Sequence, residues 1–353
     1  MLSADHVRAN LLVKLGELTG RTHALPLVLF APTARCNSRC VSCEWWRADG
    51  ASDLSRDEIA RLAEELPRFG TRLVVFTGGE PLVRPDVMEL ADLFRARGLV
   101  VHLLTSGLAL ERFAAEIAAR FAEVTISLDG HTPELYRQIR GVNGLDAVAA
   151  GVRALRALAP GIPVRARSTI HRLNFRFLPQ IAAHALELGV DQISFLAADV
   201  TSGAFNRAAG LPVVGGEDSP SLLLTADETT EMASVVDAFV AAPEHARAFA
   251  ERRIVPGPAG LGRLVHYYRA QLGLAPFPPV DCNAPWTSVV IEADGAVRPC
   301  FFHAPVGNLR DRPLGELLAQ AMPAFRARLD VATDAVCTKC VCTLRVGLRS
   351  KLW

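Results

Sequence analysis

The chain has 353 residues, half of them hydrophobic, and its 38 basic and 37 acidic side chains give a formal net charge of +1. This balance excludes a basic nucleic-acid-binding surface spread over the whole chain, and no block of like charges predicts a basic arm or an acidic tail. The length suits one large domain with a smaller one beside it.

Residues 1–24 predict a short amphipathic helix, because Lys14 and Glu17 interrupt their apolar run. This segment lacks the basic start and unbroken apolar core of a secretory signal, and no window reaches the ~20 apolar residues of a membrane span. Eight cysteines in such a chain indicate reduced thiols for metal binding or catalysis rather than disulfides. We therefore expect a cytoplasmic protein with no membrane and no nucleic-acid partner.

A strand pattern and a helix pattern alternate through the first half of the chain. Six apolar, β-branched runs lie at residues 25–33, 72–79, 99–107, 123–130, 162–170 and 190–199, and we expect strands of this kind to be buried on both faces. The segments between them place apolar residues at helical spacing. The alternation predicts an α/β fold at residues 25–199, a partial (β/α)6 barrel that is open on one side because it has fewer than eight units.

The alternation ends after residue 199. Segment 200–280 contains the Gly-rich stretch 203–220, a predicted helix at 226–241 and a Pro-rich exit, so we interpret it as a connector rather than another strand–helix unit. Residues 281–353 form the last predicted unit. Two short strands there flank Asp294-Gly295, a dipeptide typical of hairpin turns.

Three cysteines stand in the loop after the first predicted strand with the spacing C-x3-C-x2-C: Cys36, Cys40 and Cys43. Thiolates hold iron–sulfur clusters, and closely spaced ligands let one loop cover several corners of a cluster. Three ligands leave one iron uncovered, which suits a site that binds another molecule, and the carboxyl end of a barrel strand is where such folds build active sites. Spacing alone also permits a zinc ion with a distant fourth ligand.

This arrangement resembles the radical S-adenosylmethionine (SAM) superfamily, whose signature is C-x3-C-x2-C after the first strand of a partial (β/α)6 barrel. The sequence TGGEP at residues 77–81 stands in the position of that family's GGE motif. The resemblance implies that the three cysteines hold a [4Fe–4S] cluster whose uncovered iron binds the amino and carboxylate groups of SAM. An electron from this cluster then cleaves SAM to methionine and a 5'-deoxyadenosyl radical, which takes a hydrogen atom from the substrate.

The resemblance also implies which residues contact SAM. By family position, Gly78, Gly79 and Glu80 meet its amino group, the glycines by close backbone approach and the glutamate by a charge-assisted hydrogen bond. Three further positions are expected SAM contacts, with a turn or ion-pair role as the alternative: Ser106, Ser127 and Arg167.

The remaining five cysteines lie near the C-terminus: Cys282, Cys300, Cys337, Cys340 and Cys342. A hairpin with a cysteine at each end, joined by a later C-x2-C knuckle, supplies four thiolates for one iron–sulfur or zinc centre. After a radical SAM barrel this pattern resembles the SPASM/twitch extension, and the cysteines are too few for the two clusters of a full SPASM region. We therefore assign one auxiliary [4Fe–4S] cluster to Cys282, Cys300, Cys337 and Cys340, as in 2-deoxy-scyllo-inosamine dehydrogenase-like enzymes. Cys342 is left as an alternative ligand, a thiol donor or, by default, a small buried residue.

An auxiliary cluster with four filled corners passes electrons, which favours oxidation of the substrate. We expect a radical SAM dehydrogenase that oxidises an alcohol carbon of a hydroxylated small molecule, such as a sugar or aminocyclitol of natural-product biosynthesis, to a ketone. The family implies flavodoxin or ferredoxin as the electron donor. Only about 25 residues precede the first strand, which argues against a leader-peptide-binding domain.

Other functions remain as alternatives. They are a peptide maturase that forms a crosslink, a small-molecule epimerase or decarboxylase, and a non-enzymatic module that binds two zinc ions. No catalytic residue is assigned. His171, Asp199 and Glu292 are candidate bases. His303, just after Cys300, is a candidate to tune the auxiliary cluster, and a structural role is the expectation for it.

Overall fold

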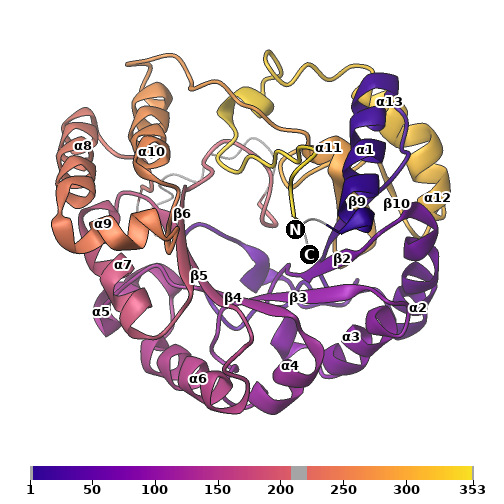
Figure 1. The fold of residues 1–353 in the computed structure, drawn as a ribbon, viewed down its shortest axis with the longest axis horizontal. Helices are drawn as coiled ribbons and strands as arrows, with labels where there is room; N and C mark the ends of the chain where they lie inside the picture. Colours follow the sequence, from indigo (N-terminus) through magenta and orange to yellow (C-terminus); the bar gives the residue numbers. More distant parts are fainter. Residues whose placement is uncertain (1–2, 208–220, 352–353) are drawn as a thin grey trace.

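The computed structural model describes residues 3–207 and 221–351, and it shows a curved sheet with helices along its outer side (Figure 1). The strands of this described part run in the order β10-β9-β8-β1-β2-β3-β4-β5-β6-β7. All six strands predicted from the sequence are confirmed, and each is parallel to the next. They are β1 (Leu27–Phe30), β2 (Leu73–Phe76), β3 (Val100–Thr105), β4 (Glu123–Ser127), β5 (Val164–Ile170) and β6 (Gln192–Ala197).

Two of the helices between these strands, α2 and α5, begin at a side-chain cap. A capping box of Ser55 and Glu58 starts α2, Pro133 stands in the first turn of α5, and Gly141 ends α5 in a left-handed conformation. The crossover helices are α2 (Arg56–Glu65), α3 (Val87–Arg95), α4 (Ala114–Arg120), α5 (Pro133–Arg140), α6 (Leu145–Leu158) and α7 (Leu178–Glu187), with short turns η1 (Trp45–Arg47), η2 (Leu66–Phe69), η3 (Pro81–Val83) and η4 (Phe175–Phe177).

The core lies between the outer face of the sheet and these helices. Phe30 and Phe76 from neighbouring strands and Phe94 from α3 pack with ring centroids 5.5 to 5.6 Å apart, and all three are fully buried. Burial of one such side chain contributes about 1.5 to 3 kcal/mol. The outer face therefore holds the barrel together, and the inner face is left for the site.

The inner face of the sheet differs from the sequence prediction. Strands β3 to β6 alternate between buried and partly or fully exposed positions, so the expectation that they are buried on both faces is wrong. The reason is that the sheet does not close, so its inner face borders an open interior. Polar side chains occupy it, with Arg165 Nε 3.0 Å from Glu123 Oε2 and Arg165 Nη1 donating to Gln192 Oε1 at 3.1 Å.

The segment after β6 carries more structure than a connector. It contains α8 (Ala226–Ala241), α9 (Pro243–Ala250), β7 (Ile254–Val255) and α10 (Pro258–Gln271), and the predicted helix 226–241 is confirmed. Strand β7 extends the sheet in parallel with β6, so the interpretation as a connector without another strand is wrong. A strand of two residues is too short to give a periodic signal. Most of the Gly-rich stretch 203–220 lies at residues 208–220, outside the described residues.

The C-terminal unit continues the same sheet. Strand β8 pairs in parallel with β1, with Phe30 opposite Ile291, and forms the predicted hairpin with β9 through Gly295, whose φ is +87°. Helix α1 (Ala4–Thr19) confirms the predicted N-terminal helix and contacts α11. Its predicted amphipathic pattern is wrong, because Leu11 and Leu18 are exposed whereas Asn10 is buried. The other elements of this unit are α11 (Ala284–Thr287), β8 (Ser288–Ile291), β9 (Ala296–Arg298), β10 (Gly307–Asn308), α12 (Leu314–Glu316), the π-helical turn η5 (Leu317–Ala321), α13 (Met322–Arg326) and η6 (Cys337–Lys339). Among the described residues, no helix is both long and apolar enough to cross a membrane.

Candidate active site

The loop that carries the first three cysteines leaves β1 and is fixed against the end of α5. Arg39 N donates to Arg140 O at 2.8 Å and Val41 N donates to Ile139 O at 3.0 Å. Because these bonds lie between the cysteines, they hold this stretch of the loop against α5. The three thiols lie near enough for negative charge on Cys40 to raise the pKa of Cys36 and Cys43.

Burial governs the protonation of these thiols. It raises the pKa of Cys36 to about 11 and that of Cys43 to about 12, and it also raises the pKa of Cys40. Without a metal the thiols therefore stay protonated near neutral pH. A metal that binds here must displace those protons, and its binding free energy must offset their removal.

A buried ion pair next to the thiols was not predicted from the sequence. Arg140 Nη1 lies 3.1 Å from Asp129 Oδ2, with side-chain exposures of 12% and 5%, and Thr169 N donates to Asp129 Oδ1 at 2.7 Å. The position of Asp129 just after β4 is a signal that could have found it, whereas nothing in the sequence marks Arg140.

Arg140 also provides a test of whether the loop suits a cluster. Its charge partly opposes the rise in the pKa of the three thiols. Its Nε is buried and has no hydrogen-bond partner among the described residues. A buried, unpaired N–H donor on a cation beside three thiols fits an anionic group held by those thiols, such as an iron–sulfur cluster.

The GGE motif packs directly on the cysteine loop. A Cβ at Gly78, which has a φ of +100°, would lie 2.5 Å from Ala31 Cβ, and a Cβ at Gly79 would lie 2.2 Å from Arg35 O. Gly79 N donates to Thr33 O at 3.2 Å, so the two loops meet backbone to backbone. The glycines thus serve the contact between loops, and their contact with SAM stays a prediction.

The glutamate of the motif is held rigidly. Glu80 is 1% exposed, and its carboxylate accepts hydrogen bonds from Leu82 N at 3.1 Å, Thr105 Oγ1 at 2.7 Å and Ser106 N at 2.6 Å. The Ser106 hydroxyl in turn lies 3.3 Å from Asn37 Oδ1 in the cysteine loop. Three donors fix the orientation of the carboxylate at the wall of the site.

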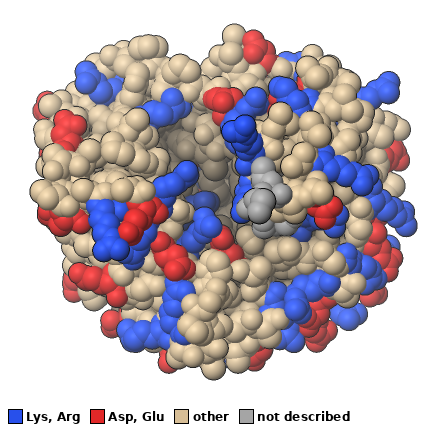
Figure 2. All heavy atoms as spheres, in the orientation of Figure 1, with Lys and Arg blue, Asp and Glu red and all other residues tan. Residues whose placement is uncertain are grey.

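One cavity of about 220 Å³ lies at the carboxyl ends of the strands. Figure 2 shows the molecular surface hollowed at the centre of the arc, with Lys and Arg side chains along the hollow. The structure brings together all nine residues predicted for the first cluster and SAM, since each of them lines this cavity: Cys36, Cys40, Cys43, Gly78, Gly79, Glu80, Ser106, Ser127 and Arg167.

Two of the three candidate bases also line the cavity, but each is already paired. Glu292 Oε1 lies 2.5 Å from Arg298 Nε, and Asp199 forms a buried ion pair with Arg207. His171 is fully buried outside the cavity lining, and its Nδ1 accepts a hydrogen bond from Leu173 N at 3.2 Å. None of the three is therefore poised as a free base.

The thiols assigned to the auxiliary cluster also converge. Burial raises the pKa of Cys300 to about 11 and that of Cys337 to about 12, and negative charge on Cys282 adds to both shifts. Burial is the largest cause that raises the pKa of Cys340, and negative charge on Cys342, Cys300 and Cys282 adds to it. Cys282 and Cys300 thus lie within electrostatic reach of both Cys337 and Cys340, which fits a shared metal centre.

The default expectation that Cys342 is a small buried residue is wrong. It is the exposed cysteine, and of the five C-terminal thiols in the described part of the chain it is the one that lines the cavity. The residue as a whole is exposed, but its thiol is enclosed by protein: burial raises the pKa of this thiol, and the Arg167 guanidinium opposes that rise. Arg167 therefore lies within electrostatic reach of Cys342.

Comparison with known protein families agrees with this geometry. The Radical SAM superfamily profile matches residues 30–172, and the SPASM profile, described as an iron–sulfur cluster-binding domain, matches residues 282–341.

The chain is similar to several curated enzymes. It is 36% identical to the PqqA peptide cyclase of Rhodopseudomonas palustris over 202 residues, which cover 55% of this chain and 52% of the relative. It is 37% identical to the probable GTP 3',8-cyclase of Thermococcus kodakarensis over 132 residues (36% and 43%), and 32% identical to the AdoMet-dependent heme synthase of Methanosarcina barkeri over 173 residues (48% and 49%). The chain thus spans about half the length of the curated relatives it matches.

Solved structures share the fold. Streptococcus suis SuiB bound to S-adenosylmethionine superimposes with a TM-score of 0.65 at 13% identity, over 96% of this chain and 77% of that one. The native anSMEcpe enzyme with bound AdoMet gives 0.62 at 18% identity, over 88% and 84%. The cofactors that follow from the two domains are a [4Fe–4S] cluster, an auxiliary cluster and SAM. The chain belongs to the radical SAM superfamily, with a radical SAM domain followed by a C-terminal SPASM domain.

Proposed function

We propose that this enzyme is a radical SAM peptide maturase that forms a crosslink in a peptide substrate. The observation that carries the proposal is its 36% identity to a PqqA peptide cyclase over 202 residues. SuiB, which shares the fold, has also been solved with the precursor peptide SuiA. Dehydrogenation of a hydroxylated small molecule, the expectation from the sequence, has no such support among the relatives compared above.

The predicted site residues have separate tasks in this proposal. Cys36, Cys40 and Cys43 hold the first cluster, and Gly78, Gly79, Glu80, Ser106, Ser127 and Arg167 form the surface that receives SAM. Cys282, Cys300, Cys337 and Cys340 hold the auxiliary cluster. When bound, the first cluster supplies the electron that converts SAM into a hydrogen-abstracting radical, and the auxiliary cluster accepts an electron from the substrate.

The chain contributes orientation and charge to this chemistry. Three donors hold the Glu80 carboxylate in place, so it can accept a hydrogen bond from an ammonium group without first reorienting. Arg167 lines the cavity and makes one side-chain hydrogen bond among the described residues, with Ser194 Oγ at 3.4 Å. Its guanidinium therefore remains available for a carboxylate of SAM or of the substrate.

Crosslinking requires the net loss of two hydrogen atoms from the peptide. One would leave as a hydrogen atom to the SAM-derived radical, and the other would leave as a proton to solvent and an electron, for which a bound auxiliary cluster would be the acceptor. Because no free base lines the cavity among the described residues, we assign that proton to no side chain.

Epimerisation is the second candidate, and Cys342 is the observation that favours it. A thiol that lines the cavity can return a hydrogen atom to a substrate radical, which leaves the substrate mass unchanged. Incubation in deuterated water separates the two reactions. A crosslinked product has lost two hydrogen atoms, whereas an epimerised product keeps one deuterium at carbon.

The test begins with anaerobic reconstitution, for which we expect about eight irons per chain. The protein is then reduced with SAM and with two panels of candidates, precursor peptides and hydroxylated small molecules, and 5'-deoxyadenosine is measured. Peptide-dependent 5'-deoxyadenosine with loss of two hydrogen atoms from the peptide supports the proposal. Stimulation by a sugar or aminocyclitol alone would reinstate the dehydrogenase, and colourless protein with bound zinc would reject an enzyme altogether. A variant with Cys36, Cys40 and Cys43 changed to alanine is the inactive control.

A further inference from the structure

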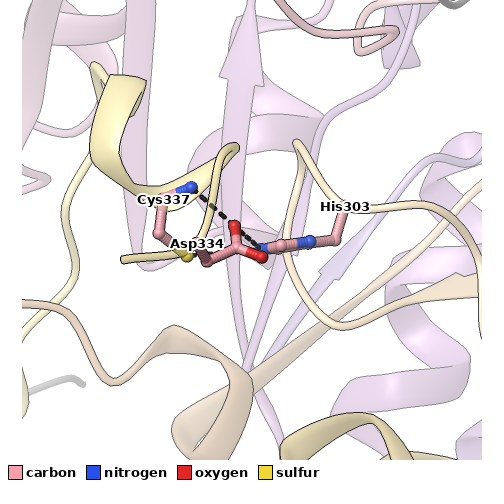
Figure 3. A group of neighbouring side chains, drawn as sticks. All are labelled: His303, Asp334 and Cys337. Atoms are coloured by element: carbon pink, nitrogen blue, oxygen red, sulfur yellow. Dashed lines mark hydrogen bonds and ion pairs between the residues drawn. The ribbon is translucent and has the colours of Figure 1, made fainter. Parts of the chain in front are cut away.

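A histidine lies against one of the thiols assigned to the auxiliary cluster (Figure 3). His303 stands in the loop after Cys300 and is 7% exposed. Its Nε2 lies 3.3 Å from Cys337 Sγ and 3.6 Å from Asp334 Oδ1. From the sequence, the position of His303 just after Cys300 made it a candidate to tune the auxiliary cluster, with a structural role as the expectation.

Contacts on two sides fix the imidazole ring. The ring of Phe325 packs edge-on against it, with centroids 4.9 Å apart and planes at 72°. The backbone carbonyl of His303 accepts a hydrogen bond from Arg298 Nη1 at 2.9 Å, and Arg298 is the partner of Glu292 in the cavity wall. Because both the backbone and the ring are held, the direction in which Nε2 points is set by the fold.

Asp334 fixes the thiol from the other side. Its Oδ1 accepts hydrogen bonds from Val336 N and Cys337 N, both at 2.9 Å, and so it shapes the turn that presents Cys337. With two backbone donors already on that oxygen, the sulfur is the nearer acceptor for the imidazole N–H. A thiolate that holds iron has no proton, so it can only accept.

We propose that His303 is a positioning residue of the auxiliary cluster, because its Nε2–H donates a hydrogen bond to the Cys337 sulfur and makes the cluster a better electron acceptor. A hydrogen bond to a ligand sulfur is stronger when the cluster carries the extra electron, so it favours the reduced state. This inference rests on the proposed assignment of Cys337 to that cluster. It explains how a cluster with four filled corners could take an electron from substrate.

A different use of the same residues is a mononuclear metal site. His303, Asp334 and Cys337 each offer a ligand atom, and these atoms lie within 4.8 Å of one another. Cys337 is also within electrostatic reach of Cys282 and Cys300, which a mononuclear site would leave unused. The convergence of thiols therefore favours a cluster with the histidine beside it.

The experiment uses the full chain with Cys36, Cys40 and Cys43 changed to alanine, so that only the auxiliary cluster contributes. In this background His303→Leu removes the donor, His303→Gln keeps an N–H donor on a side chain of similar reach, and His23→Leu removes an exposed histidine elsewhere as the control. Iron per chain and the midpoint potential are measured anaerobically by spectroscopic redox titration.

We expect His303→Leu to lower the ratio of reduced to oxidised cluster roughly three- to tenfold at a fixed potential. This is a shift of about 30 to 60 mV to more negative values for one electron. His303→Gln should recover at least half of the shift, and His23→Leu should show none. A merely structural histidine would lower stability without moving the potential.

The other outcomes test either the role of His303 or the assignment of the auxiliary cluster. An unchanged potential in His303→Leu, or the same shift in His303→Gln as in His303→Leu, overturns the role of His303. If His303→Leu loses its iron, retention of iron in His303→Gln supports the role and loss in both variants overturns it. A parent protein that binds zinc instead of iron, or no metal, refutes the cluster assignment itself and not the histidine.

Discussion

Replacement of Arg140 by methionine tests whether the buried ion pair supports the cysteine loop. Methionine keeps much of the volume of the side chain but leaves the Asp129 carboxylate without its cation. Removing one partner of a buried pair typically costs about 3 to 5 kcal/mol. Asp129 keeps one donor, the backbone N–H of Thr169 at 2.7 Å, so we place the cost near the lower end, at about 3 kcal/mol.

The assay is urea unfolding of the metal-free protein together with iron content after anaerobic reconstitution. With a slope of about 3 kcal/mol per molar urea, the midpoint should fall by roughly 1 M. Iron content should fall too, because the guanidinium no longer opposes the rise in the pKa of the three thiols. Arg137→Met, one turn earlier on α5 at an exposed position, is the matched control and should change neither quantity.

A double variant shows whether the lower stability of Arg140→Met comes from the unpaired charge or from lost packing. If the loss comes from an unpaired carboxylate, adding Asp129→Asn to Arg140→Met should restore part of the stability, since the remaining buried group is then neutral. If Arg140→Met unfolds at the same urea concentration as Arg137→Met, or if Asp129→Asn lowers stability further, the ion pair does not have the role described here.

Three further predictions concern other parts of the site. Gly79→Ala should bind little iron after reconstitution, because the new Cβ would lie 2.2 Å from Arg35 O. Gly161→Ala is the control and should bind iron normally, because a Cβ there meets no atom within 4 Å. Equal iron contents in the two variants would contradict the packing of the two loops. Burial lowers the pKa of His171 to about 4 against 6.5 in the unfolded chain, so the unfolded state binds the extra proton, and stability should fall by about 2 kcal/mol from pH 7 to pH 5. His171→Gln should lack that component in a comparison of unfolding free energies at the two pH values, and an unchanged dependence on pH would count against it. Cys342→Ala should keep both its auxiliary iron and the proposed crosslinking activity within about tenfold, because the four thiols proposed as ligands would complete the cluster without it. Loss of iron would make Cys342 a ligand, and loss of solvent deuterium from an unoxidised product would make it a hydrogen donor.

The features predicted correctly from the sequence have local signals. An apolar run with a turn on each side marks a strand, and the spacing C-x3-C-x2-C marks a loop with converging thiols. The resemblance to the radical SAM superfamily implied that Glu80, Ser127 and Arg167 belong to one site, and they line one cavity. Parallel strands end at one edge of a sheet, so residues at those ends can meet there.

The features missed depend on contacts between distant segments. Arg140 meets the cysteine loop only because α5 ends against it, and nothing near Arg140 in the sequence announces that contact. The direction in which Cys342 points depends on how the C-terminal turn packs, so spacing alone could not separate a buried thiol from one that lines the cavity. His303 was considered because it follows Cys300, yet its contact with Cys337, 34 residues away, was beyond any local pattern.

The pairing of β8 with β1 determines how the two groups of thiols are placed relative to each other. Ala31 N donates to Ile291 O at 2.9 Å, and Leu54 N donates to Ala293 O at 2.6 Å, so backbone bonds tie the cysteine loop region to the hairpin that carries Cys282 and Cys300 at its two ends. Such bonds leave little freedom for one thiol group to move against the other. Electron transfer between two centres becomes less efficient as their separation grows, and here a continuous sheet rather than a flexible linker sets that separation. A change in the register of β8 on β1 would therefore move the hairpin, with Cys282 and Cys300 at its ends, against the loop that carries the first three cysteines.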